Sequence, residues 1–385
     1  MLSTDRHQVG RLANPRPVNK HSDYPATRRR LLIALQAQMA LGLVGCSSGG
    51  GSAAPATSAS KGPATSTPQR HYSPDHKAYD YSDHFSSNVS DDAAAFTRMI
   101  EDGHGLMHVN PGARIRFATD SARIGISLRY SARISSQEIF NGVGTVLVNG
   151  EVWTTFERDW GDAGDIVVAL EFPDAYVRII EVLLPLSAGV EFLGAKLDNQ
   201  AVLMKPPLRP ALRCGVFGDS ISQGLGASCS ERSWPFLLGR MKQWQIINGG
   251  YAGYPCLPET ARAYAEAQVD VATYMIGAND FARQIPLDQF RTRFHQWMLT
   301  YRALTPTTKL YCVTPTHTLI DRPIPLEAYR EVILAMNSTI RDPLTTVIDG
   351  PSLAPRDTHH FPDGLHPGDE GSGRIANSLA AQLSV

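Results

Sequence analysis

Residues 212–222 read LRCGVFGDSIS, and this stretch contains the transition that decides the fold. Residues 212–217 form a short, mostly apolar run, which is typical of a strand buried on both faces of a sheet. The run ends at Gly218-Asp219-Ser220, where Gly218 permits a tight turn into a following helix. The stretch therefore predicts a strand, a turn and a helix, with the Ser220 hydroxyl presented at the carboxyl end of the strand.

The same alternation of strand and helix continues to the last residue. Strands are expected at residues 212–217, 245–247, 269–276, 309–314 and 345–349, and helices at residues 234–241, 258–268, 286–304, 325–340 and 369–383. This order predicts an α/β fold, in which a doubly wound parallel sheet of flavodoxin-like type lies between two layers of helices. Functional groups of such sheets lie at the carboxyl ends of the strands.

Four polar segments marked by glycine follow strands or precede the last helix: Gly218-Asp219-Ser220, Asn248-Gly249-Gly250-Tyr251-Ala252-Gly253, Gly277-Ala278-Asn279-Asp280 and Asp363-Gly364-Leu365-His366. Each supplies a part that acyl transfer needs. A serine hydroxyl such as that of Ser220 is a weak nucleophile until a base takes its proton. His366 suits that task because the ordinary pKa of imidazole is near neutrality. Asp363 can fold back on a turn and orient the ring.

The tetrahedral intermediate of acyl transfer also needs hydrogen-bond donors for its oxyanion. The backbone N–H groups of Ser220 and Gly250 and the side-chain amide of Asn279 are the candidates. All three follow neighbouring strands of the expected sheet, so we expect them at one edge.

Together the four segments resemble the four blocks of the SGNH, or GDSL, hydrolase superfamily, over residues 209–385. By this resemblance Ser220 is the nucleophile, His366 the base and Asp363 the orienting acid, while Gly250 and Asn279 complete the oxyanion hole. Asp219 is usually structural in that family. We expect no cofactor, and no metal, because no ligand cluster accompanies His359 and His360.

Residues 79–208 have a β pattern. Apolar and polar residues alternate along residues 124–131, and Asn149-Gly150 between two apolar runs predicts a hairpin. Short strands separated by turns predict a jelly-roll-like β-sandwich, with one short helix near residues 91–101. A β-sandwich ahead of an SGNH domain is similar to carbohydrate esterase family 2, which implies acetylated sugars or polysaccharides as substrates.

Residues 1–46 resemble a bacterial lipoprotein signal. Three arginines precede a 14-residue apolar stretch that ends in Leu43-Val44-Gly45-Cys46, which is similar to a lipobox with Cys46 as the lipidated residue. The segment is compatible with export by either the general or the twin-arginine route. Residues 47–78 are expected to be a flexible linker, since all but three of residues 47–70 are Ala, Gly, Ser, Thr or Pro. The expected location is the periplasm or the cell surface, with a lipid anchor.

The charge balance restricts the partners. The formal net charge is −1, and no apolar run reaches the 18 or so residues that cross a bilayer. Nucleic acid is excluded as a partner because phosphate binding needs clustered basic residues. We expect a monomer that meets the membrane through its lipid alone and takes an acylated small molecule or polysaccharide as substrate.

Cysteine and aromatic residues leave alternatives open. Cys214 and Cys312 fall within expected buried strands, whereas Cys229 and Cys256 lie in loops near the active site and are candidates for a disulfide. Three aromatic residues are core candidates, with a sugar platform as the alternative: Trp234, Tyr251 and Tyr254.

Three functions compete on this sequence. The first is a serine esterase that removes acetyl or short acyl groups, on carbohydrate. The second is an O-acyltransferase that uses the same triad with a sugar hydroxyl as acceptor. The third is a noncatalytic surface lipoprotein whose sandwich binds glycan.

Overall fold

The computed structural model describes residues 68–98, 108–133, 140, 142–158 and 163–385. All of them belong to one unit of the chain, Pro63–Val385. The predicted signal peptide, Cys46 and residues 47–67 of the predicted linker lie outside the described residues. No helix within the described ranges is both long and apolar enough to cross a membrane.

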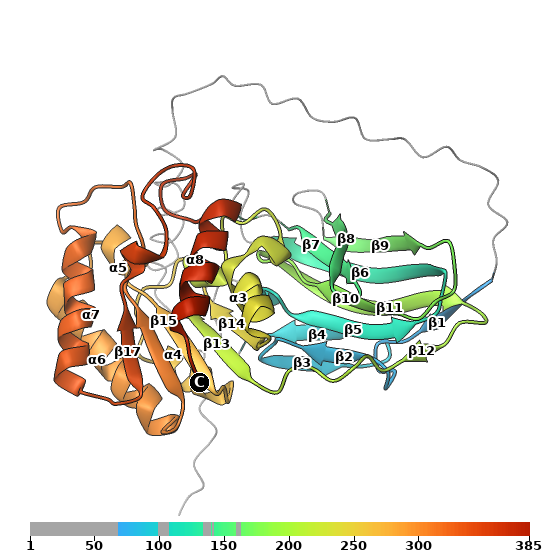
Figure 1. The fold of residues 1–385 in the computed structure, drawn as a ribbon, viewed down its shortest axis with the longest axis horizontal. Helices are drawn as coiled ribbons and strands as arrows, with labels where there is room; N and C mark the ends of the chain where they lie inside the picture. Colours follow the sequence, from blue (N-terminus) through green and yellow to red (C-terminus); the bar gives the residue numbers. More distant parts are fainter. Residues whose placement is uncertain (1–67, 99–107, 134–139, 141, 159–162) are drawn as a thin grey trace, which may run out of the picture. The chain divides into compact units, whose positions relative to one another are not determined.

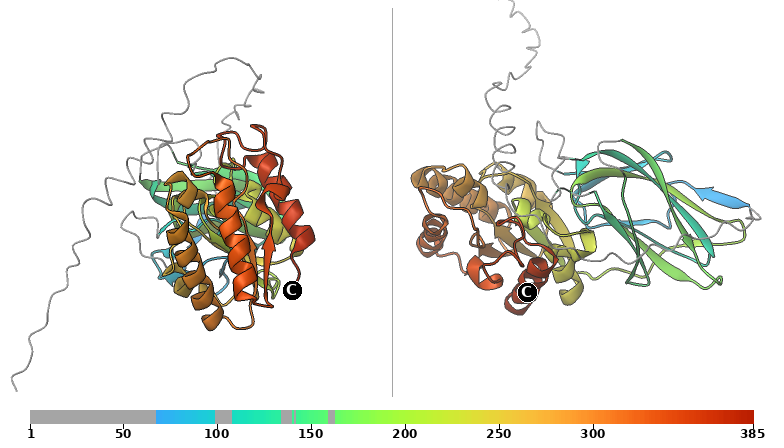
Figure 2. Two further views of the ribbon diagram at one scale, coloured as in Figure 1. Left: turned by 90° about the vertical axis from the view of Figure 1, so that its left-hand side faces the viewer. Right: turned by 90° about the horizontal axis from the view of Figure 1, so that it is seen from above.

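Two antiparallel sheets form the N-terminal part (Figure 1). In the first sheet the strand order is β3 (Ser86–Val89), β4 (Ala94–Thr97), β11 (Ala188–Asp198), β6 (Arg123–Arg133) and β9 (Gly164–Glu171), with β1 (Gln69–Tyr72) also pairing with β11. In the second it is β12 (Leu203–Met204), β5 (Arg114–Thr119), β10 (Arg178–Leu183), β7 (Gly144–Val148) and β8 (Glu151–Phe156), with β2 (Asp80–Ser82) on β5. The right-hand view of Figure 2 shows the two sheets as facing layers.

The predicted sandwich is confirmed at the level of individual side chains. Ile124, Ile126 and Leu128 of β6 are at most 2 % exposed and share one core with residues from both sheets. The predicted hairpin joins β7 to β8, and Asn149 and Gly150 have φ angles of 53° and 83°. Positive φ at both central residues is the turn that matches the twist of paired strands.

Two expectations for this part are corrected. The predicted helix near residues 91–101 is wrong where the structure describes it, because Ala94–Thr97 is strand β4. Ala94 and Phe96 are buried there while their neighbours are half-buried, a period of two rather than 3.6. The predicted linker also extends too far, since β1 at Gln69–Tyr72 pairs along four residues with β11. Backbone hydrogen bonding, which side-chain composition does not show, determines this boundary.

The C-terminal part is the predicted doubly wound fold. Its parallel sheet has the order β14 (Gln245–Gly250), β13 (Arg213–Gly218), β15 (Val271–Met275), β16 (Lys309–Val313) and β17 (Thr345–Ile348). Helix α3 (Trp234–Lys242) packs against α8 (Asp369–Gln382), while α4 (Thr260–Glu266) and α7 (Leu326–Ile340) both pack against α6 (Leu287–Leu304). The left-hand view of Figure 2 shows these helices in two layers. The strand order reverses between β13 and β15, and such switch points are where α/β sheets place their sites.

Candidate active site

Ser220 stands on a sharp turn at the carboxyl end of β13. Gly218 has a φ of +138°, and a Cβ there would lie 1.9 Å from the Met275 carbonyl oxygen of β15. Asp219 is the N-cap of α2 (Ser220–Gln223), and its carboxylate accepts a hydrogen bond from the Ile221 N–H at 3.0 Å. As the first residue of α2, Ser220 has a backbone N–H with no acceptor inside the helix.

The loop before α8 brings His366 to Ser220. The His366 Nε2 and the Ser220 Oγ are 2.8 Å apart, and the His366 Nδ1 lies 2.6 Å from the Asp363 Oδ2. His366 is 3 % exposed and Ser220 is 7 % exposed. The structure thus unites the three residues that sequence patterns proposed as nucleophile, base and acid, although Ser220 and His366 are 146 residues apart.

Local hydrogen bonds fix the carboxylate of Asp363. Its Oδ1 accepts from the backbone N–H groups of Leu365 and His366, at 2.9 Å and 2.7 Å. Burial by itself would raise the pKa of Asp363, but the hydrogen bonds and charge of His366 hold that pKa below its usual value. An ionised Asp363 can orient the imidazole and stabilise the imidazolium that forms when Ser220 loses its proton.

The three candidate oxyanion donors differ in whether they already donate a hydrogen bond within the protein. Gly250 ends β14, where a Cβ would lie 2.0 Å from the Gln223 backbone nitrogen, so glycine is required for β14 to approach α2. Its N–H, however, donates to the Asn248 Oδ1 at 2.9 Å. Asn279 is 4 % exposed, and its side-chain amide makes no hydrogen bond to any residue that the structure describes. Asn279 and the Ser220 N–H are therefore the available donors, while Gly250 must share or release its N–H.

Two further carboxylates lie buried beside these residues. Burial raises the pKa of Asp219 to about 7, against the opposing effects of the Ile221 N–H and the His366 charge. Burial likewise raises the pKa of Asp280 to about 6. The Asp280 Oδ2 accepts from the Cys256 N–H at 2.8 Å. Both carboxylates fix backbone turns, which agrees with a structural role for Asp219.

The cysteine prediction is wrong. Cys229 and Cys256 are both free thiols. The Cys256 sulfur lies in the core, 3.6 Å from the Tyr274 hydroxyl, whereas the Cys229 sulfur lies 3.6 Å from the Ser228 hydroxyl. Burial raises the pKa of each thiol, which disfavours the reactive thiolate.

The aromatic candidates are mainly core residues. Trp234 is fully buried and donates its indole N–H to the Ile221 carbonyl at 2.6 Å, so it supports the helix that begins at Ser220. Tyr251 is also fully buried, with its ring 4.3 Å from the half-buried ring of Tyr254. Neither Trp234 nor Tyr251 can serve as an exposed sugar platform. Across the described ranges, no three His, Cys, Asp or Glu side chains gather as metal ligands.

The sandwich supplies residues that the sequence did not single out. Arg98, which directly follows β4, is 4 % exposed and donates from Nη1 to the Gly250 carbonyl at 2.5 Å. Its Nε donates to the Val109 carbonyl, and its guanidinium lies 4.6 Å from the centre of the Tyr251 ring. Arg98 thus ties the sandwich to the end of β14, beside the candidate oxyanion site. No pattern near Arg98 points to this contact, because its partner is 152 residues away.

Gln223 makes a second connection of this kind. Its side-chain amide donates to the Leu186 carbonyl of the sandwich at 2.7 Å, and its amide oxygen accepts from the Ala252 N–H at 3.0 Å. The helix that carries Ser220 is therefore braced by both parts of the chain.

The C-terminal part also matches a known family in sequence. Residues 216–374 match the model of the GDSL-like Lipase/Acylhydrolase family. No curated protein sequence matches the chain.

Solved structures resemble both parts together. The salicylyl-acyltransferase SsfX3 from a tetracycline biosynthetic pathway is 20 % identical, with a TM-score of 0.70 over 82 % of this chain and 97 % of that one. A protein of Bacteroides ovatus described as a GDSL-like lipase is 15 % identical, with a TM-score of 0.70 over 81 % of this chain and 96 % of that one. A family two carbohydrate esterase from Clostridium thermocellum, solved with cellohexaose, is 13 % identical, with a TM-score of 0.62 over 79 % of this chain and 97 % of that one. At these identities the likeness is one of fold.

Proposed function

We propose that the protein is a serine esterase that hydrolyses acetyl or short-acyl esters on carbohydrate. The observation that carries the proposal is the chain of hydrogen bonds from Ser220 through His366 to Asp363, within a GDSL-like domain. A serine hydroxyl, an imidazole and an ionised carboxylate in this order are the parts of a covalent acyl-transfer mechanism.

In the first half of the reaction, the Ser220 Oγ attacks the ester carbonyl carbon while the His366 Nε2 takes the hydroxyl proton. The carbonyl oxygen becomes an oxyanion, to which the Ser220 N–H and the Asn279 amide donate. When the intermediate collapses, the bond between the carbonyl carbon and the alcohol oxygen breaks. His366 returns its proton to that oxygen, and the alcohol leaves an acyl group on Ser220.

In the second half, water takes the place of the alcohol. The His366 Nε2 removes a proton from the water, whose oxygen attacks the acyl carbon. Collapse of this second intermediate breaks the bond to the Ser220 Oγ, and His366 gives its proton back to that oxygen. The products are the free acid and the unmodified enzyme. Asp363 remains ionised and holds the Nδ1 side of the ring throughout.

Carbohydrate is proposed as the alcohol part because solved structures with the same two-part architecture include carbohydrate esterases. One of them is described as an acetyl xylan esterase from Butyrivibrio proteoclasticus, with a TM-score of 0.56 over 79 % of this chain. The purified full-length protein and its Ser220→Ala variant should therefore be compared on acetylated xylan, mannan, glucosamine and short p-nitrophenyl esters. The proposal requires acetate release that depends on Ser220, and it fails if neither class of ester is cleaved.

An O-acyltransferase is the second candidate, favoured by the similarity to SsfX3, which is described as a salicylyl-acyltransferase. In that reaction a sugar hydroxyl takes the place of water in the second half. Acetate release should be measured with and without added sugar acceptor, together with the acylated sugar. An esterase keeps releasing acetate, whereas a transferase diverts the acyl group to the acceptor.

A noncatalytic glycan-binding lipoprotein is the third candidate. A phosphonate that reacts with activated serines distinguishes it from both enzymes. Such a reagent should label the wild-type protein and spare the Ser220→Ala variant. A wild-type protein that resists labelling would favour the noncatalytic reading.

We further propose that Cys46 is lipidated and anchors the protein at the periplasmic face of a membrane or on the cell surface. The support is the sequence Leu43-Val44-Gly45-Cys46 behind a basic and apolar segment. The Cys46→Ala variant should leave the membrane fraction after a salt wash and keep its esterase activity, because residues 47–67 separate the lipid from the folded part. Retention of this variant in the washed membrane fraction would refute the anchor.

A further inference from the structure

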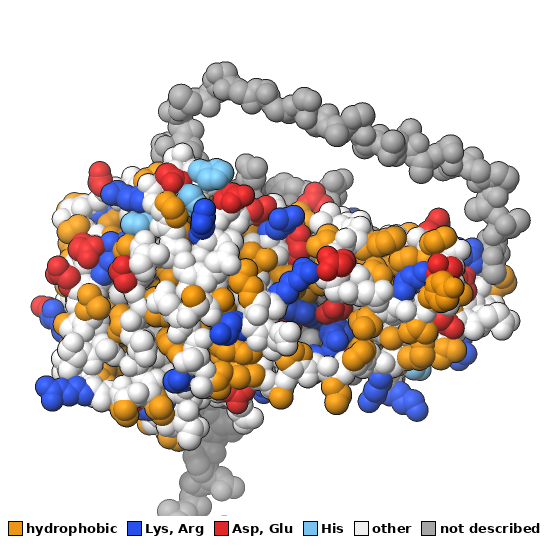
Figure 3. All heavy atoms as spheres, viewed as in Figure 1, with side chains coloured by type: hydrophobic (Ala, Val, Ile, Leu, Met, Phe, Trp, Pro, Cys, Tyr) orange, Lys and Arg blue, Asp and Glu red, His pale blue; other side chains and the backbone are white. Residues whose placement is uncertain are grey.

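Exposed apolar side chains gather at one end of the sandwich, which we call the tip and which comprises residues 119–122, 172–178 and 199–203. Tyr176 is 74 % exposed, Val177 is 60 % exposed and Val202 is 53 % exposed. Figure 3 shows hydrophobic side chains gathered over the sandwich on the face drawn there. Single exposed apolar residues are ordinary, whereas a contiguous exposed patch marks an interaction surface.

Strand pairing places the two valines on one outward face. Thr119 of β5 pairs with Arg178 of β10 on one side and with Leu203 of β12 on the other, and all three are buried. Successive side chains of a strand point to opposite faces, so Val177 and Val202, which directly precede these partners, both point outward. Two strand spacings separate them, a distance of about 10 Å. They therefore belong to one patch, which the neighbouring tyrosine extends.

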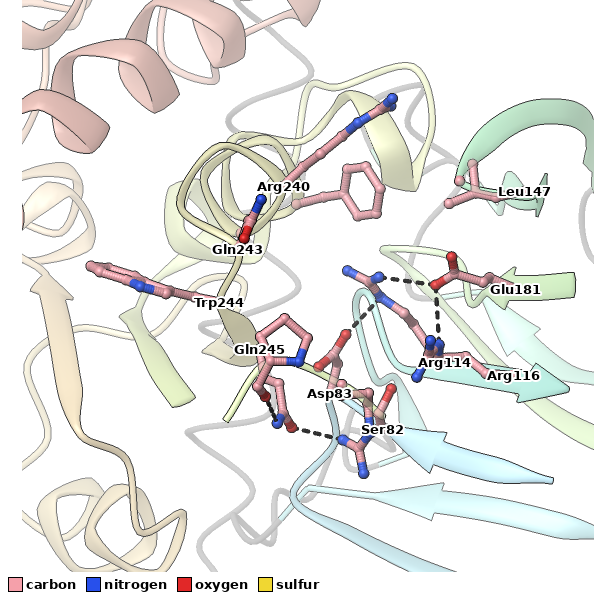
Figure 4. Close-up of a pocket in the computed structure, with 15 residues that line it drawn as sticks. Ser82, Asp83, Arg114, Arg116, Leu147, Glu181, Arg240, Gln243, Trp244 and Gln245 are labelled. Atoms are coloured by element: carbon pink, nitrogen blue, oxygen red, sulfur yellow. Dashed lines mark hydrogen bonds and ion pairs between the residues drawn. The ribbon is translucent and has the colours of Figure 1, made fainter. Parts of the chain in front are cut away.

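The opposite end of the sandwich is the one that contacts the hydrolase domain. Arg114 begins β5 there, and it lines a pocket together with Glu181 of the sandwich and Gln243 of the hydrolase domain. Figure 4 shows Arg114 and Glu181 on one side of this pocket and Gln243 on the other. Thr119 ends β5, and a strand of six residues is roughly 17 Å long. The tip is therefore separated from this contact by about the length of a strand.

Ion pairs neutralise charges at and beside the tip. Asp174 forms an ion pair with Arg178, which also donates to the Tyr176 carbonyl at 2.7 Å. Asp198 forms an ion pair with Arg123 at 2.6 Å. Paired charges select neither an anionic nor a cationic partner, so the exposed apolar side chains dominate what this surface can bind.

The chain from the predicted lipid anchor enters the fold at this tip. The Pro68 carbonyl accepts a hydrogen bond from the Asn199 N–H at 3.2 Å, in the turn that leads to Val202. Residues 47–67 separate Pro68 from Cys46, and their composition predicts a flexible chain. Such a chain has a root-mean-square length of about 25 Å. Lipidation of Cys46 would therefore hold the tip closer to the bilayer than the hydrolase domain.

We propose that the patch of Tyr176, Val177 and Val202 rests in the interfacial layer of the lipid bilayer that carries the anchor. The inference rests on the proposed lipidation of Cys46. At such an interface an aromatic ring with a hydroxyl group can face both acyl chains and water, while the valine side chains leave water. Three side chains bind lipid only weakly by themselves, but the linker keeps their local concentration at the bilayer high. The contact would turn the hydrolase domain away from the bilayer.

The contact should be measured on the lipidated full-length protein in phosphatidylcholine vesicles by electron paramagnetic resonance. A nitroxide label is placed at Val177→Cys or at Val202→Cys, because the native cysteines of the described ranges are buried. Leu299→Cys is the matched control, since Leu299 lies on α6 of the hydrolase domain and is 50 % exposed. Vesicles should lower the accessibility of the first two labels to a water-soluble nickel chelate several-fold and leave that of the third unchanged.

Flotation of the vesicles separates this inference from the anchor. Protein that does not float refutes the lipid anchor, and the contact with it. Protein that floats with all three labels equally accessible overturns the contact alone. Protection of the labels by acetylated xylan in the absence of lipid would also overturn the contact, because the patch would then bind glycan.

Two further variants, each labelled at Val202→Cys, locate the contact. Tyr176→Ser combined with Val177→Ser should restore the accessibility of the label without lowering the melting temperature, because the replaced side chains are exposed. Leu334→Ser, which changes an exposed leucine of α7, should leave the label protected. High salt should also leave it protected, because the contact is apolar. A label that stays protected after the double substitution, or that high salt exposes, would refute the contact.

Discussion

Two turns in the C-terminal part each place an aspartate carboxylate against a histidine three residues later, and their surroundings differ. In the first turn, residues 357–360, the Asp357 Oδ1 accepts from the His360 N–H at 2.9 Å and lies 2.7 Å from the His360 Nδ1. In the second turn, residues 363–366, the two contacts use different oxygens of Asp363: Oδ1 accepts from the His366 N–H at 2.7 Å, and Oδ2 lies 2.6 Å from the His366 Nδ1. The sequence Asp-x-x-His therefore brings a carboxylate onto the Nδ1 of the following histidine twice, six residues apart.

What lies opposite the ring distinguishes the two turns. The His366 Nε2 meets the Ser220 Oγ, whereas the His360 Nε2 makes no hydrogen bond to a residue in the described ranges. His360 instead stabilises the start of α8, because its backbone carbonyl accepts a hydrogen bond from the N–H of Gly368, the N-cap of that helix. A carboxylate that orients an imidazole is thus not by itself a catalytic unit. We propose that the second turn takes part in catalysis because the Ser220 hydroxyl and the hydrogen-bond donors of Ser220 and Asn279 lie opposite its histidine.

The two histidines give the strongest test of this comparison. His366→Ala should lower kcat/KM by on the order of 10⁴-fold or more, because among the described residues only the His366 Nε2 is hydrogen-bonded to the Ser220 Oγ and can take its proton. His360→Ala should keep kcat/KM within a few-fold of the wild-type value and lower the melting temperature, since its ring is mostly buried. Initial rates on p-nitrophenyl acetate and thermal melts of both variants provide the measurement. Loss of activity in His360→Ala without unfolding would break the comparison.

The two carboxylates form the next pair. Asp363→Asn should lower kcat by roughly 10³–10⁴-fold, because an amide favours the wrong tautomer of His366. Asp357→Asn should leave kcat nearly unchanged. If the two variants lost similar activity, the position of the ring opposite Ser220 would not explain the difference between the turns.

The pH dependence of stability sharpens this pair. The pKa of Asp363 is held below its usual value, so this group stabilises the fold above its unfolded pKa, and the stabilisation is lost as the pH falls through the folded pKa. The wild-type protein should therefore melt higher than Asp363→Asn at neutral pH, and the two melting temperatures should converge only as the pH falls below the ordinary pKa of an aspartate, about 3.9. Divergence toward low pH would contradict this sign.

Local patterns predicted much of this structure, whereas contacts between distant segments escaped them. The strand that ends at Gly218, the alternation of β6 and the turn of Asp363 all depend on residues close together in sequence. The hydrogen bond from the Gly250 N–H to Asn248 spans two residues, and an Asn two positions before a glycine could have indicated it.

Other features depend on partners that a local pattern does not include. Arg98 lies beside the candidate active site because β4 brings its side chain to the Gly250 carbonyl, 152 residues away in sequence. The predicted Cys229–Cys256 disulfide is absent because the two sulfurs have different neighbours, Ser228 for Cys229 and Tyr274 for Cys256, and such packing is not visible in a local pattern. The strand β4 has only four residues, which is too short for its apolar pattern to distinguish a strand from a helix. Its pairing with β3 and β11, which are distant in sequence or polar, identifies it as a strand.

Variants of Asn279 test whether a hydrogen-bond donor near Ser220 and His366 stabilises the transition state. Its amide has no partner among the described residues, and the oxygen that it would serve carries full negative charge only in the tetrahedral intermediate. Asn279→Ala should reduce kcat by roughly 10²–10³-fold with little change in KM. Asn279→Asp should be at least as harmful, because a carboxylate repels an oxyanion. A variant that loses melting temperature but keeps most of its kcat would reduce Asn279 to a structural residue.

The smallest expected effect concerns Arg98, the sandwich residue that donates to the Gly250 carbonyl beside the candidate oxyanion site. Its guanidinium donates to the Gly250 and Val109 carbonyls at once, and a lysine ammonium cannot reproduce that planar fork. Because the Gly250 peptide lies beside α2, we expect Arg98→Lys to displace the oxyanion site slightly. The expected result is a roughly tenfold fall in kcat, about 1.4 kcal/mol, with KM nearly unchanged.

Arg178→Lys is the matched control for Arg98→Lys. Arg178 is another buried arginine of the sandwich, lies 4.2 Å from the centre of the Phe172 ring and donates to the Tyr176 carbonyl at 2.7 Å. Both substitutions should lower the melting temperature, since each replaces a buried guanidinium and part of its hydrogen bonding. Only Arg98→Lys should lower kcat, because only Arg98 contacts the end of β14. If both variants lost kcat in proportion to their loss of stability, Arg98 would have no positioning role, and the second turn would depend on the hydrolase domain alone.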